Sequence, residues 1–435
     1  MPKASEFHKK TLKDIDLEGK TVLVRTDYNV PVDESGKITD DYRIKQSLPT
    51  VQYLISKNCK IVLCSHLGRP DGKRDLKFTL RPCAESLSSL IGEQVDFIDD
   101  CIGDKVAEKV ASLKQGQICL LENLRFYPEE ESNDTEFAKE LAGSAQVFVQ
   151  DGFGVVHRAH ASTDAITNIL PSVAGFLLEK EVSTITSVMN NPNRPLMSVI
   201  GGAKISDKID VLNRLIDISD IVAVGGAMAN TFLHAKGVNT GKSLIEKSEI
   251  GVAKQIMKRA KDKSAIQKFV LYIPQDAVVA TGLDKSAKTR IVDWDAHVVA
   301  DIENYPKRVP RSESVVADDE MILDIGPFSG AFIAGAIQLS GTVIWNGALG
   351  VTEVKGLQGP IGPFAHGTQL LVDALLGDFG NKPYSLLGGG DTVGYIRDLG
   401  LTDMFNHVST GGGASIELMS GLALPGVESL LNKDD

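Results

Sequence analysis

The chain has 435 residues, of which 43% are hydrophobic and 24% are charged, and its formal net charge is −11. This length exceeds what one compact core usually holds, so we expect a soluble protein of two domains. The negative charge argues against broad nucleic-acid binding, and no stretch approaches the roughly 20 apolar residues that cross a bilayer. A polar start and five cysteines without a CxxC pair favour a cytoplasmic protein with reduced thiols.

Short apolar runs alternate with helical patterns along the chain. The runs hold four to six residues rich in Val, Ile and Leu, as in parallel strands that are buried on both faces. Helices are predicted at 43–58, 135–145, 170–190 and 206–219. The alternation predicts an α/β fold with two doubly wound, Rossmann-like parallel sheets. The breaker NNPNRP follows the third helix, so we divide the chain into 1–185 and 186–417. The charged, irregular stretch 283–320 is interpreted as a segment on the protein surface, with no assigned role.

In the first half of the chain, the apolar runs end in basic and small polar residues. These residues are Asp27, Asn29, His66, Arg69, Arg125 and Arg158. Strand ends of a parallel sheet meet at one edge, and guanidinium groups bind small polyanions through charged hydrogen bonds. A turn or a solvated loop would explain any one of these strand ends. Their repetition predicts a site for a small anionic substrate.

In the second half, the apolar runs end in glycine pairs and triplets. The segment GGAKISDK at 201–208 runs from a strand into a helix, where we expect Lys204 and Lys208 to share one face. Two like charges on one helix face are costly unless an anion lies between them. Glycines at such turns let phosphates approach backbone N–H groups, so this half predicts a nucleotide site.

Two more glycine clusters precede predicted helices. Asp391 follows the glycines at 388–390 and is a natural Mg²⁺ ligand beside a phosphate-binding turn. The glycines at 411–413 open the last long helix and offer free backbone N–H groups. Other candidate motifs fail: 237–243 is one residue short of a Walker A loop, and no HRD loop precedes the DGFG at 151–154.

With these motifs in view, the chain resembles the phosphoglycerate kinase family. RTDYNVP, SHLGRP, LENLRF, HRAHAST, GGAKISDK, WNGALGV, GGGDT and STGGGAS occur in the family's order, from about Lys20 to about Val427. The resemblance implies reversible phosphoryl transfer from 1,3-bisphosphoglycerate to MgADP, giving 3-phosphoglycerate and MgATP. It implies a triose-phosphate-binding domain at 1–185, completed by the tail 418–435, and a nucleotide-binding domain at 186–417. A hinge helix joins the domains, and a monomer is expected.

The resemblance also assigns residues to roles. Its substrate-binding positions are Asp27, Tyr28, Asn29, Arg43, His66, Leu67, Gly68, Arg69, Arg125 and Arg158. Its nucleotide-binding positions are Gly202, Lys204, Lys208, Gly226, Ile322, Asn346, Glu353, Gly389, Gly390, Asp391 and Thr392. Among these, Asp391 is the expected ligand of Mg²⁺. Its catalytic candidates are Arg43, Lys204, Lys208, Gly389 and Gly412. No general base is required, because the accepting carboxylate is already ionised.

Three departures from the family pattern lie on the base and ribose side. Ala348 stands where proline is usual, Thr352 where phenylalanine is usual, and Ile322 where glycine is common. None removes a charge from the reacting centre, so an active enzyme with a shifted nucleotide preference is one alternative. A catalytically weak relative that acts as a binding or regulatory protein is the other. Intact charges argue against it, since a decaying site loses them first.

Overall fold

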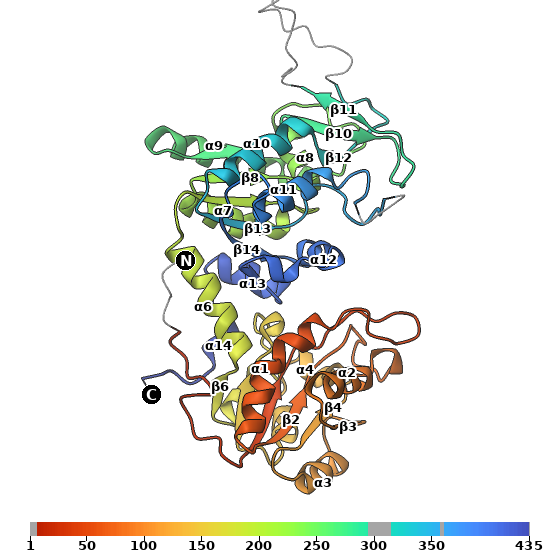
Figure 1. Cartoon of the computed structure of the whole chain (residues 1–435), viewed down its shortest axis with the longest axis vertical. Coiled ribbons are helices and arrows are strands. Elements are labelled where there is room, and N and C mark those ends of the chain that lie inside the picture. The colour runs from red at the N-terminus through yellow and green to blue at the C-terminus, as the bar shows by residue number, and fades with distance from the viewer. Residues whose placement is uncertain (1–6, 295–314, 357–360, 435) are drawn as a thin grey trace, which may run out of the picture. The chain divides into compact units, whose positions relative to one another are not determined.

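The computed structural model describes residues 7–294, 315–356 and 361–434 (Figure 1). The described residues form two compact units, an N-terminal unit of 7–184 and 422–434 and a C-terminal unit of 185–421. Helix α6, Phe176–Asn190, contains the point of division. Each unit has its own six-stranded parallel sheet, which confirms the predicted α/β class.

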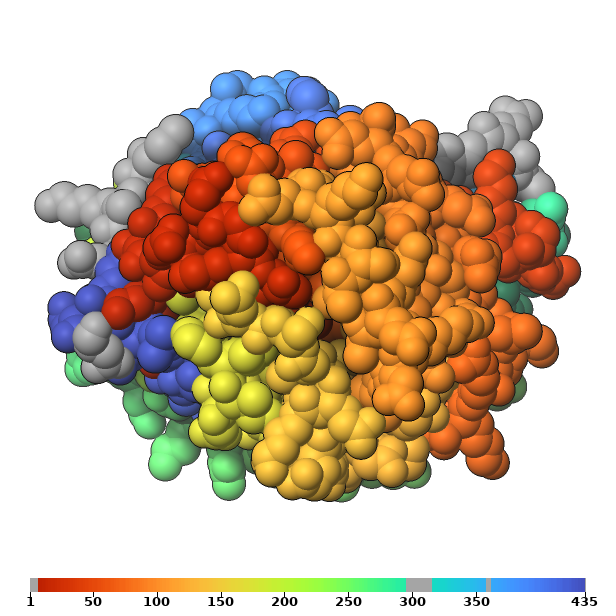
Figure 2. Space-filling view, turned by 90° about the horizontal axis from the view of Figure 1, so that it is seen from below, coloured from red at the N-terminus to blue at the C-terminus, as the bar shows by residue number. Residues whose placement is uncertain are grey.

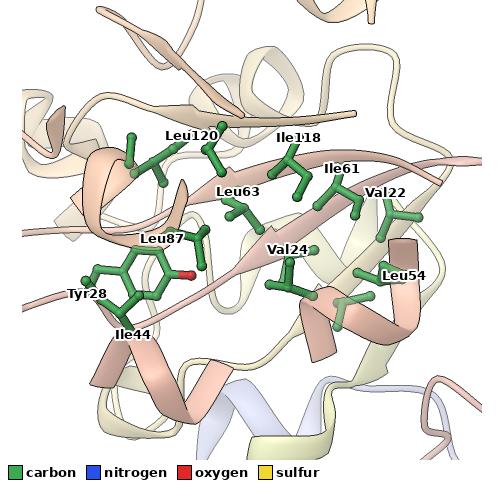
Figure 3. Close-up of a cluster of buried hydrophobic side chains, with 14 of the residues drawn as sticks. Val22, Val24, Tyr28, Ile44, Leu54, Ile61, Leu63, Leu87, Ile118 and Leu120 are labelled. Atoms are coloured by element: carbon green, nitrogen blue, oxygen red, sulfur yellow. The ribbon is translucent and has the colours of Figure 1, made fainter. Parts of the chain in front are cut away.

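The N-terminal sheet has the strand order β3-β4-β2-β1-β5-β6. Its strands are β1 Thr21–Arg25, β2 Lys60–Cys64, β3 Val95–Ile98, β4 Ile118–Leu121, β5 Val147–Gln150 and β6 Ser172–Ala174. Its helices are α1 Tyr42–Ser56, α2 Arg81–Ile91, α3 Asp104–Ser112, α4 Pro128–Glu131, α5 Thr135–Ala142 and, from the tail, α14 Pro425–Glu428. Alternate strand residues enter separate cores, so Val24 and Leu63 pack with the α1 and α2 side (Figure 3), whereas Leu23 and Val62 pack with the α3 and α5 side.

The tail of the chain pairs with the start of the N-terminal unit. The backbone N–H of Lys10 donates to the carbonyl of Leu431 at 2.7 Å, and that of Lys433 donates to the carbonyl of His8 at 2.9 Å. Figure 2 shows this unit from below, with the beginning of the chain in red and its end in blue. Residues far apart in the sequence therefore share backbone pairing here.

The C-terminal unit has a six-stranded parallel sheet, ordered β15-β14-β13-β7-β8-β9, and a separate three-stranded antiparallel sheet, ordered β11-β10-β12. The parallel strands are β7 Leu196–Ile200, β8 Ile221–Val224, β9 Val270–Tyr272, β13 Thr342–Asn346, β14 Tyr384–Gly388 and β15 His407–Val408. The antiparallel strands are β10 Asp276–Ala280, β11 Arg290–Asp293 and β12 Met321–Ile325. The helices are α7 Ile209–Ile218, α8 Gly226–Ala235, α9 Ile250–Ile266, α10 Pro327–Gln338, α11 His366–Leu376, α12 Gly390–Asp398 and α13 Gly412–Met419.

Four predicted segments need correction. The predicted helix 170–190 begins only at Phe176, because its first residues form β6. The stretch 283–320 contains β11 in its described part, and the rest of it lies largely outside the described residues. The helix after 411–413 is not long, since α13 has 8 residues. Lys204 precedes a 3₁₀ turn at 206–208 and α7 starts at Ile209, so Lys204 and Lys208 do not share a helix face.

All five cysteines lie in the N-terminal unit and are buried, without disulfides. Burial raises the thiol pKa of Cys59 to about 11 and the pKa values of three others, Cys64, Cys83 and Cys119, to about 12. Burial also raises the pKa of Cys101 well above its usual value. Thiols held in the protonated form are poor nucleophiles, so the role of these cysteines is packing. No helix in the described part of the chain is long and apolar enough to cross a membrane.

Candidate functional site

An ion pair stands at the end of β1. The Nη1 of Arg43, in the first turn of α1, lies 2.5 Å from the Oδ2 of Asp27. The carboxylate is buried, and its other oxygen accepts the backbone N–H of Asn29 at 3.2 Å. Gly154 packs against this pair, because a Cβ there would lie 2.1 Å from the Asp27 Oδ2 that contacts Arg43. The pair thus holds a partly exposed guanidinium in a fixed orientation.

A second set of contacts joins the ends of β1, β2 and β4. The backbone N–H of Gly68 donates to the Oδ1 of Asn29 at 2.9 Å, and its carbonyl accepts from the Nη1 of Arg125 at 3.0 Å. Gly68 has φ +63°, and a Cβ there would lie 2.4 Å from the Phe78 ring. Arg125 Nε is 3.1 Å from Glu131 Oε1, an ion-pair distance without hydrogen-bond geometry. Glycine is required where these strand ends approach.

Four arginines follow strands or begin a helix on this side of the N-terminal unit. Arg69 and Arg158 are exposed, Arg43 is half-buried, and Arg125 is buried. Burial lowers the pKa of Arg125, and the positive charge of Arg158 contributes in the same direction. Arginine nevertheless keeps its proton at any physiological pH. We refer to these four residues with Asp27, Asn29 and His66 as the N-terminal half-site.

His66 is buried and lies beside a buried arginine. Its Nδ1 is 3.3 Å from the Nη2 of Arg25. Burial, followed by the charges of Arg25, Arg125 and Arg43, lowers the pKa of His66 well below its usual value. His160 behaves similarly, with a pKa of about 4 caused first by burial. The positive charge of this half-site therefore resides on its arginines.

Two residues predicted to bind substrate have side chains in the core. The Tyr28 ring is fully buried in the hydrophobic cluster (Figure 3). Its hydroxyl is hydrogen-bonded to the Ser47 hydroxyl at 2.8 Å. Leu67 is 3% exposed, and its carbonyl accepts from the Nδ2 of Asn123 at 2.7 Å. Either residue would therefore contact a substrate through its own backbone and not through its side chain.

The structure adds Arg25 and Glu130, which sequence reasoning missed. Both side chains are fully buried, and both contact Ser162. The signal available in the sequence was an arginine at the last position of an otherwise apolar strand. Buried charges are rare unless they are paired, so a buried Arg25 implies a buried acidic partner.

In the C-terminal unit, the ends of three strands pack backbone against backbone. The N–H of Gly201 donates to the Asn346 carbonyl at 2.9 Å, and that of Gly202 donates to the Ala348 carbonyl at 3.0 Å. Gly226 has φ +64°, and a Cβ there would lie 2.6 Å from the nitrogen of Gly202. A Cβ on Gly347, at φ +95°, would lie 2.3 Å from the Gly201 carbonyl oxygen. Only glycine fits such approaches.

Lys208 is tied into this packed backbone. Its Nζ donates to the Gly201 carbonyl at 2.7 Å, the Asn346 carbonyl at 3.2 Å and the Asn346 Oδ1 at 2.7 Å. Burial lowers the Lys208 pKa to about 8, opposed by the charge of Asp391. The Nδ2 of Asn346 is buried and has no partner among the residues that the structure describes. Lys204, by contrast, is exposed.

Two helices begin near each other beside Asn346. Gly389 precedes α12 at φ +91°, and a Cβ there would lie 3.0 Å from the Asn346 Oδ1. A Cβ on Gly412, the first residue of α13, would lie 3.6 Å from the nitrogen of Gly390. The Thr392 hydroxyl accepts the N–H of Gly347 at 2.7 Å. Neighbouring helix N-termini favour anions through their free N–H groups and dipoles.

A cavity of about 260 Å³ lies in the C-terminal unit. Its lining includes five of the predicted nucleotide-binding residues: Gly202, Gly226, Ile322, Glu353 and Asp391. Most of the wall is apolar, with Leu233, Leu244 and Leu323 among the lining residues. Pro274 and Trp294 also line it and were not predicted. An apolar wall with few polar groups is typical of small-molecule sites.

Asp391 is exposed on this wall in the first turn of α12. Within the described ranges, no three His, Cys, Asp or Glu side chains gather as a metal site would require. One carboxylate fits Mg²⁺ only if phosphate oxygens and water supply the other ligands. Asp391 therefore suits a metal that arrives with a nucleotide. We refer to the cavity, Lys204, Lys208 and the starts of α12 and α13 as the C-terminal half-site.

An arginine-rich strand edge suits a small polyanion, and a glycine-lined cavity near two helix N-termini suits a nucleotide. Two α/β units, each built on a parallel β-sheet and each carrying one of these half-sites, define the class of kinases with two α/β domains. The family model described as phosphoglycerate kinase matches residues 12–422. The chain belongs to the phosphoglycerate kinase family, as its motifs predicted.

Curated relatives and solved structures agree with this membership. The chain is 43% identical over 425 residues to a phosphoglycerate kinase of Moorella thermoacetica, covering 98% of this chain and 100% of the relative. It is 46% identical over 422 residues to that of Desulforapulum autotrophicum, covering 97% and 100%. The structure of phosphoglycerate kinase from Coxiella burnetii matches with a TM-score of 0.79 at 36% identity, covering 97% of this chain and 98% of that one. The chain is thus a kinase that transfers phosphate to a carboxyl group.

Proposed function

We propose that the chain catalyses the reversible, Mg²⁺-dependent transfer of a phosphoryl group between 1,3-bisphosphoglycerate and ADP, giving 3-phosphoglycerate and ATP. The observation that carries this proposal is the division of binding chemistry between the half-sites. Four arginines gather in one unit, and a glycine-lined cavity with two helix N-termini lies in the other. Each half-site suits one of the two substrates.

The N-terminal half-site would hold the triose. Arg69, Arg125 and Arg158 would bind the distal phosphate, since guanidinium forks match its oxygens in pairs. The buried carboxylate of Asp27 would accept the glycerate hydroxyl, and Asn29 would assist at the carboxylate end. Arg43, fixed at 2.5 Å from Asp27, would direct its remaining N–H groups at the reacting carboxylate.

The C-terminal half-site would hold the nucleotide. The apolar cavity would take the base, with Ile322 in its wall, and Glu353 would accept the ribose hydroxyls. The N–H groups of 389–392 would bind the phosphates, and Asp391 would hold Mg²⁺. Bound there, Mg²⁺ would offset the negative charge of the phosphate groups. Ile322 and Ala348 both line the cavity, so the assay below compares two bases.

Catalysis would rest on positioning and charge, without a general base. The phosphoryl group carries negative charge during transfer, so preorganised cations and N–H groups stabilise it. Arg43, Lys204 and Lys208 would supply the cations, and Gly389 and Gly412 the backbone N–H groups. Lys208 has a pKa of about 8 and is therefore mostly protonated at neutral pH. Lys204 is exposed and could reach the phosphoryl group.

In this proposal the two substrates would bind residues of different units, so transfer would require a domain movement that brings the two substrates together. Closure would also exclude water, which otherwise hydrolyses an acyl phosphate. The candidate hinges are α6 and the backbone at 409–413. We expect the enzyme to act as a cytoplasmic monomer, without a nucleic-acid or membrane partner.

The test is a coupled assay with 3-phosphoglycerate and Mg²⁺, run with ATP, with GTP and without nucleotide. Robust turnover that needs ATP, Mg²⁺ and 3-phosphoglycerate supports the proposal. Turnover that favours GTP would support the shifted preference, and Ile322→Gly should then restore the use of ATP. Folded protein that turns over neither nucleotide would overturn the proposal.

A further inference from the structure

A single buried guanidinium divides its N–H groups among three partners behind the N-terminal half-site. The Nε of Arg25 donates to the Ser162 hydroxyl at 2.8 Å, and its Nη1 donates to the Thr26 carbonyl. Its Nη2 is 3.3 Å from the Nδ1 of His66. The side chain is fully buried, so Arg25 itself does not face a ligand. Its influence must pass through the groups it touches.

The contact with His66 determines which ring nitrogen carries the hydrogen. A guanidinium has only donors, so the Nδ1 of His66 must accept. In a neutral imidazole the hydrogen then sits on Nε2, which becomes a donor. We infer that Arg25 is a positioning residue that sets the tautomer of His66, so that His66 offers its Nε2–H to the anion in the N-terminal half-site.

Glu130 and Ser162 hold Arg25 in place. The Glu130 carboxylate accepts the Ser162 hydroxyl at 2.6 Å and the Ser162 N–H at 3.0 Å. Its Oε1 lies 3.9 Å from the Nη2 of Arg25, which offsets the buried charge. Each nitrogen of the guanidinium thus has its own contact, and rotation of the group away from His66 would leave buried groups unpaired.

Burial, followed by the charges around His66, keeps the ring neutral. Arg25, Arg125 and Arg43 each disfavour a second proton, and His160 acts in the same direction. Together with burial, they place the His66 pKa well below neutrality. The imidazole therefore has one N–H at physiological pH, and its contact with Arg25 decides where that N–H points. His66 supplies a directed hydrogen bond, and the arginines supply the charge.

The first experiment measures the tautomer in the unmodified enzyme, without substrate. The chain has eight histidines, and His66→Gln assigns the His66 signals by difference in long-range ¹H–¹⁵N spectra. We expect a neutral Nε2–H ring whose signals stay constant from about pH 6 to about pH 8. A hydrogen on Nδ1, or titration of His66 within this range, overturns the inference.

The second experiment tests the dependence on Arg25. We expect Arg25→Met to give a mixture of both tautomers and to raise the KM for 3-phosphoglycerate about fivefold, the scale of one hydrogen bond, with a smaller change in kcat. Arg81→Met is the matched control, because it also replaces an arginine of the N-terminal unit, but one whose guanidinium lies over the Phe97 ring and not beside His66. Ser162→Ala removes the hydroxyl that accepts from the Nε of Arg25 and donates to Glu130. It serves if Arg25→Met does not fold, and should cause a smaller change of the same kind. A pure Nε2–H ring in both variants overturns the inference.

Only the KM part of this inference rests on the proposed function, which assigns the triose to the N-terminal half-site. A mixed tautomer in Arg25→Met with an unchanged KM would keep the link between Arg25 and His66 and would contradict the assignment of His66 to the substrate. A raised KM with an unchanged tautomer would overturn the link and keep the assignment. The two failures are therefore distinguishable.

Discussion

In the proposed function, one half-site would bind its anion through side chains and the other through the backbone. The N-terminal half-site relies on long side chains, and its arginines carry charges whose positions are set by partners such as Asp27. The C-terminal half-site relies on the backbone, with glycines packed so closely that a Cβ on Gly226 or Gly347 would overlap a neighbouring peptide. One half-site should be sensitive to the loss of charge, and the other to the gain of a single carbon.

This difference fits the two kinds of ligand. A triose phosphate is small and carries charge at both ends, so several separate guanidinium groups can grip it. A nucleotide has an apolar base and a phosphate chain, so it needs an open wall and N–H groups at close range. The following predictions test whether the two modes of binding respond as differently as the structure implies.

The largest effect is expected from Gly226→Ala. The added Cβ would lie 2.6 Å from the backbone nitrogen of Gly202 at a φ of +64°. The strand ends must then separate, which should lower kcat/KM for ATP at least about three-hundredfold and destabilise the C-terminal unit by about 3 kcal/mol. Gly237→Ala is the control, because its φ is +87° but nothing lies within 4 Å. Similar losses in both variants would show that strain, not close approach, is responsible.

The next effect is expected from Arg43→Ala. Removal of one preorganised charge should lower kcat by about a hundredfold, with the KM for ATP nearly unchanged. Steady-state kinetics with both substrates varied would measure this, with Arg81→Ala as the control. Turnover near that of the unmodified enzyme would remove Arg43 from the mechanism.

The pH dependence should reveal Lys208. Its pKa is about 8, so the proton leaves above that pH, and kcat/KM for ATP should fall up to about tenfold per pH unit. Lys208→Arg should flatten this decline, because arginine keeps its proton. The same shift has the opposite sign for folding: the unfolded chain holds the proton longer, so stability should rise from about pH 8 towards about pH 10. A pH profile equal to that of Lys208→Arg would contradict the assignment.

The smallest effect is expected from Glu353→Ala. This carboxylate is exposed on the cavity wall, so its loss should raise the KM for nucleotide about fivefold and leave kcat within about twofold. Comparison of ATP with 2′-deoxy-ATP would locate the contact. An unchanged KM for ATP would mean that the ribose hydroxyls bind elsewhere.

Sequence patterns predicted what is local or repeated. Strands such as β1 and β7 are mostly apolar runs, so both parallel sheets could be predicted, and the polar residues after them marked the edge of each sheet. The short antiparallel sheet escaped notice because β11 has four residues within a charged stretch. The prediction that Lys204 and Lys208 share a helical face was wrong, because a 3₁₀ turn at 206–208 precedes α7, which begins only at Ile209.

Contacts between distant residues could not be predicted. Arg25 and Glu130 are 105 residues apart, and no pattern in either segment names the other. The burial of the Tyr28 side chain was hidden by its position between Asp27 and Asn29, both of which belong to the half-site. The resemblance to a family gave positions, but it could not tell whether the side chain or the backbone of each residue faces the ligand.

The confinement of every cysteine to residues 59–119 makes the chain suited to labelling chemistry. In the folded protein these thiols are shielded and protonated, so a brief pulse of an alkylating reagent would modify them only in molecules whose N-terminal unit has opened. Residues 185–421 contain no cysteine, and one introduced at a buried position there would be modified only in molecules whose C-terminal unit has opened. The opening of each half of the molecule could thus be timed separately by mass spectrometry.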